Sequence, residues 1–283
     1  MTAPTTNHQP PTTGDLAREL AVARAAARAA GQIAAELQST AARSDKPDGS
    51  PVTDGDFAAD RAIQSALRSA FPDDAILSEE VPDDGARRRV SRTWIIDPID
   101  GTREYAAGRA SWCVQIGLAI DGRFVLGVLD QPSRARAWWG VPGRGAWIDQ
   151  DGAVSPLHLP RGGSTTTLVA GSSARNRNAI SQVRTVLPEF ALITEHSVGI
   201  KVGRILAGDA DLYAHARRIH AWDAAAPAAV LIAAGGTATD LAGHELRSDG
   251  PDECQPGLIF SRRTDHADIV ARFAAAGITA PLG

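Results

Sequence analysis

Apolar residues fill most positions of residues 15–38, where an acidic start is followed by Ala, Leu, Val and Ile through Ile33 and Leu37. A segment of strong helix formers that opens on an acid predicts a helix. The polar residues 39–53 that follow are rich in Gly and Pro, a composition typical of surface loops near a site. We therefore expect a helix followed by a polar loop.

A second helix is predicted to begin at Asp54 or Asp56, and both residues are candidate N-caps. The evidence for this helix is a set of apolar residues at amphipathic spacing, namely Phe57, Ile63, Leu67 and Ala70.

Two short apolar segments each end in a carboxylate. Residues 75–77 form a predicted strand that leads towards Glu79, and residues 94–96 form another that leads into Asp97. Because Pro98 has no N–H to give to a sheet, the second strand should end at Asp97. Acids that follow two adjacent buried strands can converge on a cation.

The middle of the chain is rich in predicted strands. Residues 112–120 and 123–130 flank Asp121-Gly122, a pair that suits a type I′ turn, and so predict a hairpin. Further strands are expected at residues 134–139 and 145–148. The Gly, Ser, Pro and Thr residues of 150–165 are the best candidate boundary between two halves of the chain, 15–150 and 151–283.

Beyond this boundary strands alternate with helices, a pattern typical of sheets covered by helices on both faces. The predicted strands are residues 167–170, 191–194, 211–213, 237–240 and 258–261. The predicted helices are residues 175–187, a helix after Ser197, an Ala-rich helix from 221 to 234 that Gly235-Gly236 would stop, and a closing helix at 265–275.

Composition narrows the class of protein. With 283 residues, of which 43% are hydrophobic and 22% charged, the chain has the composition of a soluble globular protein. Its net charge of −4 gives no sign of a nucleic-acid surface. Two cysteines form no disulfide framework or zinc motif, so we expect a cytoplasmic protein. Residues 1–14 should be a disordered arm with no signal peptide, and no apolar run approaches the roughly 20 residues that cross a membrane.

The segment from Asp97 to Thr102 carries the clearest chemistry. Asp97 and Asp100 come directly after a buried strand, and Gly101 permits close approach of a ligand to the backbone. The amides of Gly101 and Thr102 could face an anion if a turn or helix starts there. Magnesium takes carboxylates, water and substrate phosphate as ligands, so the segment favours a cation that holds a phosphate, although Asp-Pro and Asp-Gly also occur in ordinary turns.

Three motifs together resemble the inositol monophosphatase-like family of magnesium-dependent, lithium-sensitive phosphatases. They are Ser78-Glu79-Glu80, Asp97-Pro98-Ile99-Asp100-Gly101-Thr102 and Trp222-Asp223-Ala224-Ala225. Their order and spacing match the family signatures, and the resemblance extends over residues 16–275. It implies an αβαβα sandwich of the inositol monophosphatase and fructose-1,6-bisphosphatase type, with the site between its halves.

The resemblance also assigns roles to residues. It implies that two or three Mg²⁺ ions are held by Glu79, Asp97, the carbonyl of Ile99, Asp100 and Asp223, with Asp97 as the bridging ligand. Thr102 would activate water with an acid that pairs with it, which matches Asp56, and Glu79 completes the catalytic set. Because many relatives have a small or neutral residue where this chain has Asp54, the choice between Asp54 and Asp56 stays open.

The chemistry of phosphate esters agrees with these roles. Four carboxylates, from Glu79, Asp97, Asp100 and Asp223, balance the charge of two divalent cations before the substrate dianion arrives. Two such ions can bind the dianion, activate a water and neutralise the departing oxygen. Thr102 would help to deprotonate that water, and the Gly101 and Thr102 amides would hold phosphate oxygens.

Two segments indicate the substrate. Arg103-Glu104-Tyr105 resembles the sequence that follows this motif in CysQ-type 3′(2′),5′-bisphosphate nucleotidases, and Ser197-Val198-Gly199-Ile200-Lys201 resembles their Ser-Xaa-Xaa-Xaa-Lys segment. Lys201 would then meet a second phosphate, with Ser197 and Ser172 as further substrate contacts. Residues 215–220 add hydrogen-bond donors, and which of them contacts the nucleotide stays open.

We therefore expect an enzyme that converts adenosine 3′,5′-bisphosphate to AMP and phosphate and that supports sulfate assimilation. The enzymatic alternative is an inositol 1-phosphate or other sugar phosphatase, with fructose 1,6-bisphosphate as a further substrate. The alternative of another class is a non-catalytic phosphate-binding scaffold. The expected partner is a small phosphate ester, with no nucleic acid polymer and no membrane, and the family is often homodimeric.

Overall fold

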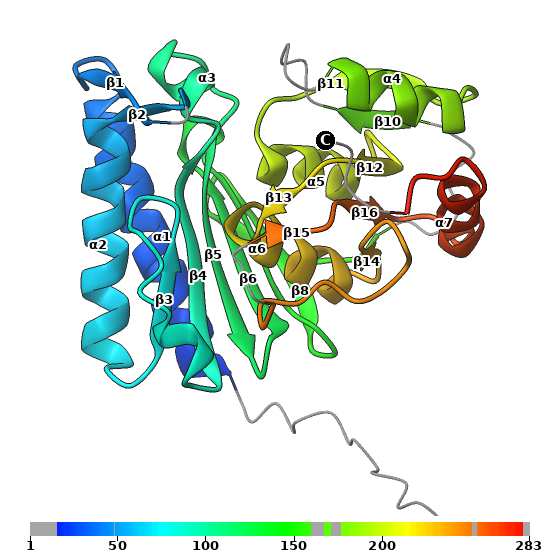
Figure 1. Cartoon of the computed structure of the whole chain (residues 1–283). Coiled ribbons are helices and arrows are strands. Elements are labelled where there is room, and N and C mark those ends of the chain that lie inside the picture. Colours follow the sequence, from blue (N-terminus) through cyan, green and yellow to red (C-terminus); the bar gives the residue numbers. More distant parts are fainter. Residues whose placement is uncertain (1–15, 48, 160–166, 171–176, 251–253, 280–283) are drawn as a thin grey trace, which may run out of the picture.

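The computed structural model describes residues 16–47, 49–159, 167–170, 177–250 and 254–279. The predicted arm at residues 1–14 and the predicted substrate contact Ser172 lie outside these ranges. The described elements stack as helices, sheet, helices, sheet and helices (Figure 1). This arrangement confirms the predicted layered α/β fold.

Two long helices, α1 (Ala17–Leu37) and α2 (Asp54–Ala70), form the first layer. They are the dark blue and light blue helices at the left of Figure 1. Ile63 and Leu67 of α2 and the buried alanines of α1 share one hydrophobic core with Trp94 and Ile96 of the neighbouring sheet. The amphipathic pattern therefore identified both helices and the faces that they bury.

A seven-stranded sheet follows, in the order β3-β4-β5-β6-β7-β8-β9. Its strands are β3 (Ala75–Ser78), β4 (Arg92–Asp100), β5 (Cys113–Ile120), β6 (Arg123–Gln131), β7 (Arg136–Val141), β8 (Gly145–Gln150) and β9 (Ala153–Leu157). Strands β3 and β4 are parallel, and the other neighbours are antiparallel. The β5–β6 hairpin turns at Asp121 (φ 48°) and Gly122 (φ 78°), the two positive angles of the predicted type I′ turn. The sheet continues through β9 into the segment predicted as a boundary, so the division of the chain at residue 150 stays a prediction.

The prediction that the strand ends at Asp97 is wrong, because β4 continues to Asp100. Asp97 pairs with Gln115 and Asp100 pairs with Cys113, so the register with β5 shifts between the two acids. This irregularity accommodates Pro98, which has no N–H for a regular ladder. It also brings both acids to the same end of the sheet.

The third layer contains α5 (Val198–Ala207) and α6 (Ala221–Ala233), which lie between the two sheets (Figure 1). Small residues let α6 come close to the large sheet. A Cβ at Gly117 would lie 2.9 Å from Cβ of Ala225, and a Cβ at Gly140 would lie 2.5 Å from Cβ of Ala233. Larger residues at these glycines would push α6 away from the sheet.

The second sheet has five strands in the order β11-β10-β12-β16-β14. They are β10 (Thr167–Ala170), β11 (Ala191–Thr194), β12 (Leu212–His215), β14 (Thr237–Thr239) and β16 (Leu258–Ser261). Helices α4 (Arg177–Val186) and α7 (His266–Ala275) cover its outer face, where Leu168, Leu212 and Phe273 share a core. None of the helices in the described ranges combines the length and hydropathy needed to cross a bilayer.

Several short elements were not predicted. The polar loop at residues 39–53 contains an antiparallel pair, β1 (Arg43–Asp45) and β2 (Pro51–Thr53). The others are α3 (Thr102–Ala106), β13 (Ile219–His220) and β15 (Cys254–Gln255). These elements are too short for a periodic pattern to develop.

The predicted N-caps of α2 are also wrong, because Thr53 occupies that position. Its side chain accepts from the N–H of Asp56, and the Asp56 carboxylate accepts from the N–H of Thr53. This reciprocal pair is a capping box. Asp54 and Asp56 are thus first-turn acids, where they favour the positive end of the helix dipole.

Candidate functional site

Three acids from distant parts of the chain lie close together at the end of the large sheet where β4 ends. Asp97 and Asp100 come from the end of β4, and Asp223 comes from the first turn of α6. Each offers a carboxylate oxygen that lies within 4.8 Å of the others. The structure therefore brings together three of the predicted metal ligands.

Burial and mutual repulsion destabilise the ionised form of these acids. Burial raises the pKa of Asp97 well above its ordinary value, and Glu79, Asp100 and Asp223 raise it further. Burial and then Asp100 and Glu79 raise the pKa of Asp223 in the same way. A bound cation would stabilise the ionised form of both acids and so offset both shifts. An all-carboxylate cluster of this kind fits a hard divalent cation such as Mg²⁺.

Glu79 lines a pocket together with Asp100 and Asp223. A lysine contacts its carboxylate. Nζ of Lys46, which follows β1, lies 2.9 Å from Oε1 of Glu79 and 3.0 Å from Oε1 of Glu80. Burial raises the pKa of Glu80 to about 7, and Glu79 adds to the shift. Sequence reasoning missed Lys46, and its place in a Gly- and Pro-rich loop beside the motifs was the available signal.

The hydroxyl of Thr102 lies between an acid and a carbonyl. Its Oγ1 is 3.1 Å from Oδ1 of Asp56 and 3.1 Å from the carbonyl oxygen of Ile99. Asp56 is buried, whereas Asp54 is exposed and accepts a hydrogen bond from the N–H of Ala42. Of the two acids left open by the sequence, it is therefore Asp56 that pairs with Thr102.

Two further contacts hold Asp56 in place. Its Oδ2 accepts from Oγ1 of Thr53 at 2.6 Å and from the N–H of Thr53 at 2.8 Å. Burial nevertheless raises the pKa of Asp56 to about 6, because desolvation outweighs these hydrogen bonds. Gly101, at φ 100°, joins this region to the acids, and a Cβ there would lie 2.7 Å from the carbonyl oxygen of Ser111. Only glycine fits this position without strain.

Donors from two elements surround one oxygen of Asp100. Its Oδ2 accepts from Nε2 of Gln115 at 2.5 Å, from Oγ of Ser197 at 2.6 Å and from the N–H of Gly199 at 2.6 Å. Ser197 was predicted as a substrate contact, but its hydroxyl hydrogen is directed at Asp100. Gln115 was not predicted, since a glutamine within a strand carries no motif.

Lys201 is buried on the side of α5 that faces the acids. Its Nζ donates to the carbonyl of His196 at 2.9 Å and lies 4.9 Å from the ring centroid of Tyr213. Burial lowers the pKa of Lys201, although Asp100 and Asp223 act in the opposite direction. Burial and Lys201 together lower the pKa of His215 to about 4.

Some of these residues line a pocket of about 500 Å³. Asp100, Asp223 and Glu79 lie in its wall, and so does Lys201. Four residues of the 215–220 segment also line it: His215, Arg218, Ile219 and His220. The volume is in the range of small-molecule sites.

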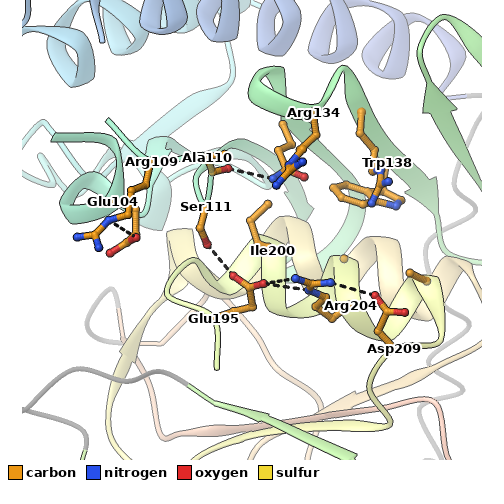
Figure 2. Close-up of a pocket in the computed structure, with 14 residues that line it drawn as sticks. Glu104, Arg109, Ala110, Ser111, Arg134, Trp138, Glu195, Ile200, Arg204 and Asp209 are labelled. Atoms are coloured by element: carbon orange, nitrogen blue, oxygen red, sulfur yellow. Dashed lines mark hydrogen bonds and ion pairs between the residues drawn. The ribbon is translucent and has the colours of Figure 1, made fainter. Parts of the chain in front are cut away.

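A second pocket, of about 470 Å³, is lined by Ile200, Arg204 and other residues of α5 and by residues such as Ser111 and Trp138 from the large sheet and its loops (Figure 2). Figure 2 shows Glu195 between the hydroxyl of Ser111 and the guanidinium of Arg204, at 2.7 Å from each. None of the three clustered acids lines this pocket. The candidate catalytic site is therefore the pocket lined by Asp100 and Asp223.

A model of the inositol monophosphatase family matches residues 15–276. The chain belongs to the inositol monophosphatase family. The three clustered acids and Thr102 lie in the motifs by which the sequence resembles this family.

Its relatives include phosphatases of nucleotide bisphosphates. The 3′-phosphoadenosine 5′-phosphate phosphatase of Mycobacterium tuberculosis is 35% identical over 212 residues, which cover 74% of this chain and 76% of the relative. The 3′(2′),5′-bisphosphate nucleotidase CysQ of Salmonella typhimurium is 31% identical over 202 residues, which cover 71% of this chain and 80% of the relative. These matches make the chain a phosphoric monoester hydrolase.

Solved structures share the fold. CysQ from Bacteroides thetaiotaomicron matches with a TM-score of 0.72 and 26% identity, over 86% of this chain and 97% of the other. The Thermotoga maritima IMPase matches with a TM-score of 0.76 and 23% identity, over 92% and 98%. At the latter identity the likeness shows the fold alone.

Proposed function

We propose that this chain is a Mg²⁺-dependent phosphatase that releases the 3′-phosphate of adenosine 3′,5′-bisphosphate and leaves AMP. The observation that carries the proposal is the cluster of Asp97, Asp100 and Asp223, two of which, Asp100 and Asp223, line a pocket together with Lys201. The similarity to a 3′-phosphoadenosine 5′-phosphate phosphatase and to a 3′(2′),5′-bisphosphate nucleotidase supports this substrate.

The metal ligands in this proposal are Glu79, Asp97, the carbonyl of Ile99, Asp100 and Asp223, which would hold two or three ions. Bound Mg²⁺ would supply positive charge for the phosphate and lower the pKa of a water. The raised pKa values of Asp97 and Asp223 support this assignment, because burial and the neighbouring carboxylates disfavour the ionised form of both groups, which a bound cation would stabilise.

Thr102 and Asp56 would accept the proton of the attacking water. The Thr102 hydroxyl can donate to Asp56 at 3.1 Å, which leaves its lone pairs to accept from water. With a pKa raised to about 6, Asp56 is a stronger base than an ordinary aspartate and remains largely ionised at neutral pH. The amides of Gly101 and Thr102 would hold phosphate oxygens, as predicted.

Lys201 would bind the second phosphate of the substrate. It is a cation in the same pocket as Asp100 and Asp223, and its ammonium group donates a hydrogen bond to a neutral carbonyl. A phosphate dianion would compensate its desolvation better than that carbonyl does.

Phosphate release from three substrates tests the proposal. We expect adenosine 3′,5′-bisphosphate to be hydrolysed with a higher kcat/KM than inositol 1-phosphate or fructose 1,6-bisphosphate, and only with Mg²⁺ present. Added Li⁺ should inhibit the reaction. Failure to hydrolyse the nucleotide in the presence of Mg²⁺ would overturn the proposal.

An inositol or sugar phosphatase is the second candidate, favoured by the family to which the chain belongs. It makes the opposite prediction in the same assay, since inositol 1-phosphate would then be the better substrate. Family membership disfavours the scaffold alternative. Sulfate assimilation, a cytoplasmic location and a homodimer stay predictions.

A further inference from the structure

The carboxylate of Asp100 is held asymmetrically. Three strong donors, from Gln115, Ser197 and Gly199, reach the same oxygen, Oδ2, at 2.5 to 2.6 Å. The thiol of Cys113 lies 3.8 Å from that oxygen as well. This arrangement fixes the rotation of the carboxylate and leaves Oδ1 as the oxygen that can face a cation.

The side-chain amide of Gln115 donates to Asp100, and its oxygen, Oε1, is left without a partner among the described residues. Gln115 is fully buried in β5. The reversed amide would place Oε1 against the carboxylate, so the ionised acid selects the observed orientation. An unpaired buried acceptor is destabilising, and a purely structural residue would not be expected to retain one.

Ser197 connects Asp100 to the other half of the molecule. Its Oγ donates to Asp100 and accepts from the N–H of Ile200 at 3.0 Å, so the hydroxyl also caps α5. The N–H of Gly199, in the first turn of α5, points at the same oxygen. The helix dipole adds to the attraction between α5 and this carboxylate.

We propose that Gln115 and Ser197 are positioning residues that hold Asp100 in the orientation required for divalent-metal binding. Ser197 is then not a substrate contact. Docking of α5 against β4 becomes a condition for a complete metal site. The proposal rests on the metal dependence in the proposed function, and it adds two residues and a helix to the metal site.

The test is titration of the metal-free protein with MgCl₂ by isothermal calorimetry, without substrate. The variants are Gln115→Met, which removes the amide at similar volume, and Ser197→Gly, which removes the hydroxyl while glycine is still tolerated as an N-cap. Loss of partners that orient metal ligands typically weakens metal binding by about 10- to 100-fold. We expect this loss in both variants, for the sites that use Asp100.

A matched control is Gln131→Met. Gln131 is a buried glutamine on the adjacent strand β6, and its Nε2 donates to the carbonyl of Ala110 at 3.1 Å, away from Asp100. We expect wild-type metal affinity in this variant. In the two positioning variants the Mg²⁺ concentration for half-maximal activity should rise, while kcat at saturating Mg²⁺ should change much less.

The experiment distinguishes failure of the positioning roles from failure of the proposed function. If the wild type binds Mg²⁺ and both variants bind it equally well, the positioning roles are wrong and the proposed function survives. If the wild type binds no Mg²⁺, the metal-dependent function fails and this inference fails with it. Should Gln115→Met not fold, Ser197→Gly alone decides: weaker Mg²⁺ binding than in the wild type supports the positioning role, and wild-type affinity overturns it.

Discussion

Individual carboxylates in this protein are placed where they oppose folding. Asp97 is 1% exposed and lies beside Asp100 and Asp223, and its pKa is raised by burial and by these neighbours. Such a group reduces the stability of the metal-free protein at neutral pH. Its presence is explained by the cation that it would bind.

Replacement of Asp97 by Asn should remove activity while the protein stays folded. Charge stabilisation by a bound metal is worth several kcal/mol, so loss of a proposed metal ligand should reduce kcat/KM by roughly 100-fold or more. The measurement is phosphate release at saturating Mg²⁺, with circular dichroism as the check on folding. Activity within a few fold of wild type would exclude Asp97 from the metal site.

The same substitution should stabilise the metal-free protein at alkaline pH. Because the folded-state pKa of Asp97 is raised, the folded protein retains a proton that the unfolded chain releases, and stability falls as pH rises above the ordinary Asp range of about 4. Asp97→Asn removes this loss. Urea denaturation in EDTA at pH 5 and pH 8 should show a smaller decrease for the variant, and an identical decrease would contradict the expected shift.

Lys201→Met should change substrate preference. If Lys201 binds the second phosphate, its loss should lower kcat/KM for adenosine 3′,5′-bisphosphate by about 10- to 100-fold, the value of a charged hydrogen bond of about 1.5–3 kcal/mol. Adenosine 3′-monophosphate, which lacks that phosphate, should be affected much less. Equal losses for both substrates would assign Lys201 a role outside specificity.

At the scale of elements, a buried ion pair connects two strands of the second sheet. Nη2 of Arg262, after β16, lies 2.7 Å from Oδ1 of Asp211, before β12, and both side chains are buried. Oδ2 of Asp211 accepts from the N–H of Thr167 at the start of β10, so one carboxylate joins three strands. This sheet carries Tyr213 and supports the side of the pocket that contains Lys201.

Arg262→Met should reduce the free energy of unfolding by about 3–5 kcal/mol, because it leaves a buried carboxylate without its partner. Adding Asp211→Asn should recover part of the loss. The control is Arg43→Met, whose pair with Asp45 is exposed and should be worth less than about 1 kcal/mol. Denaturant unfolding of the three variants measures the difference, and equal effects at Arg262 and Arg43 would contradict it.

The elements themselves were largely predictable, and the reason is visible in particular residues. Ile63 and Leu67 recur at helical spacing and are buried on one face of α2, so local pattern and tertiary packing agree. The end of β4 was not predictable, because the register shift that carries the strand past Pro98 depends on its pairing with β5. The cap of α2 was assigned to the acids because the reciprocal bonds of Thr53 and Asp56 are visible only in three dimensions.

At the scale of the whole molecule, the proposed metal site depends on how helices α5 and α6 pack against strand β4 of the large sheet. Asp97 and Asp100 come from β4, Asp223 comes from α6, and Ser197 reaches Asp100 from the N-terminus of α5. The motifs in the sequence identified the acids but not what orients them. Gln115 and Lys46 lie in no motif, and their roles follow only from where the fold places them.

The most direct test is the location of bound metal in crystals of the protein soaked in Mn²⁺, determined by anomalous scattering. We expect anomalous peaks between the carboxylates of Asp97, Asp100 and Asp223, with Oδ1 of Asp100 rather than Oδ2 as the oxygen that faces the ion. An absence of peaks among these three acids, in crystals that bind Mn²⁺ elsewhere or not at all, would contradict the metal site on which the proposed function depends.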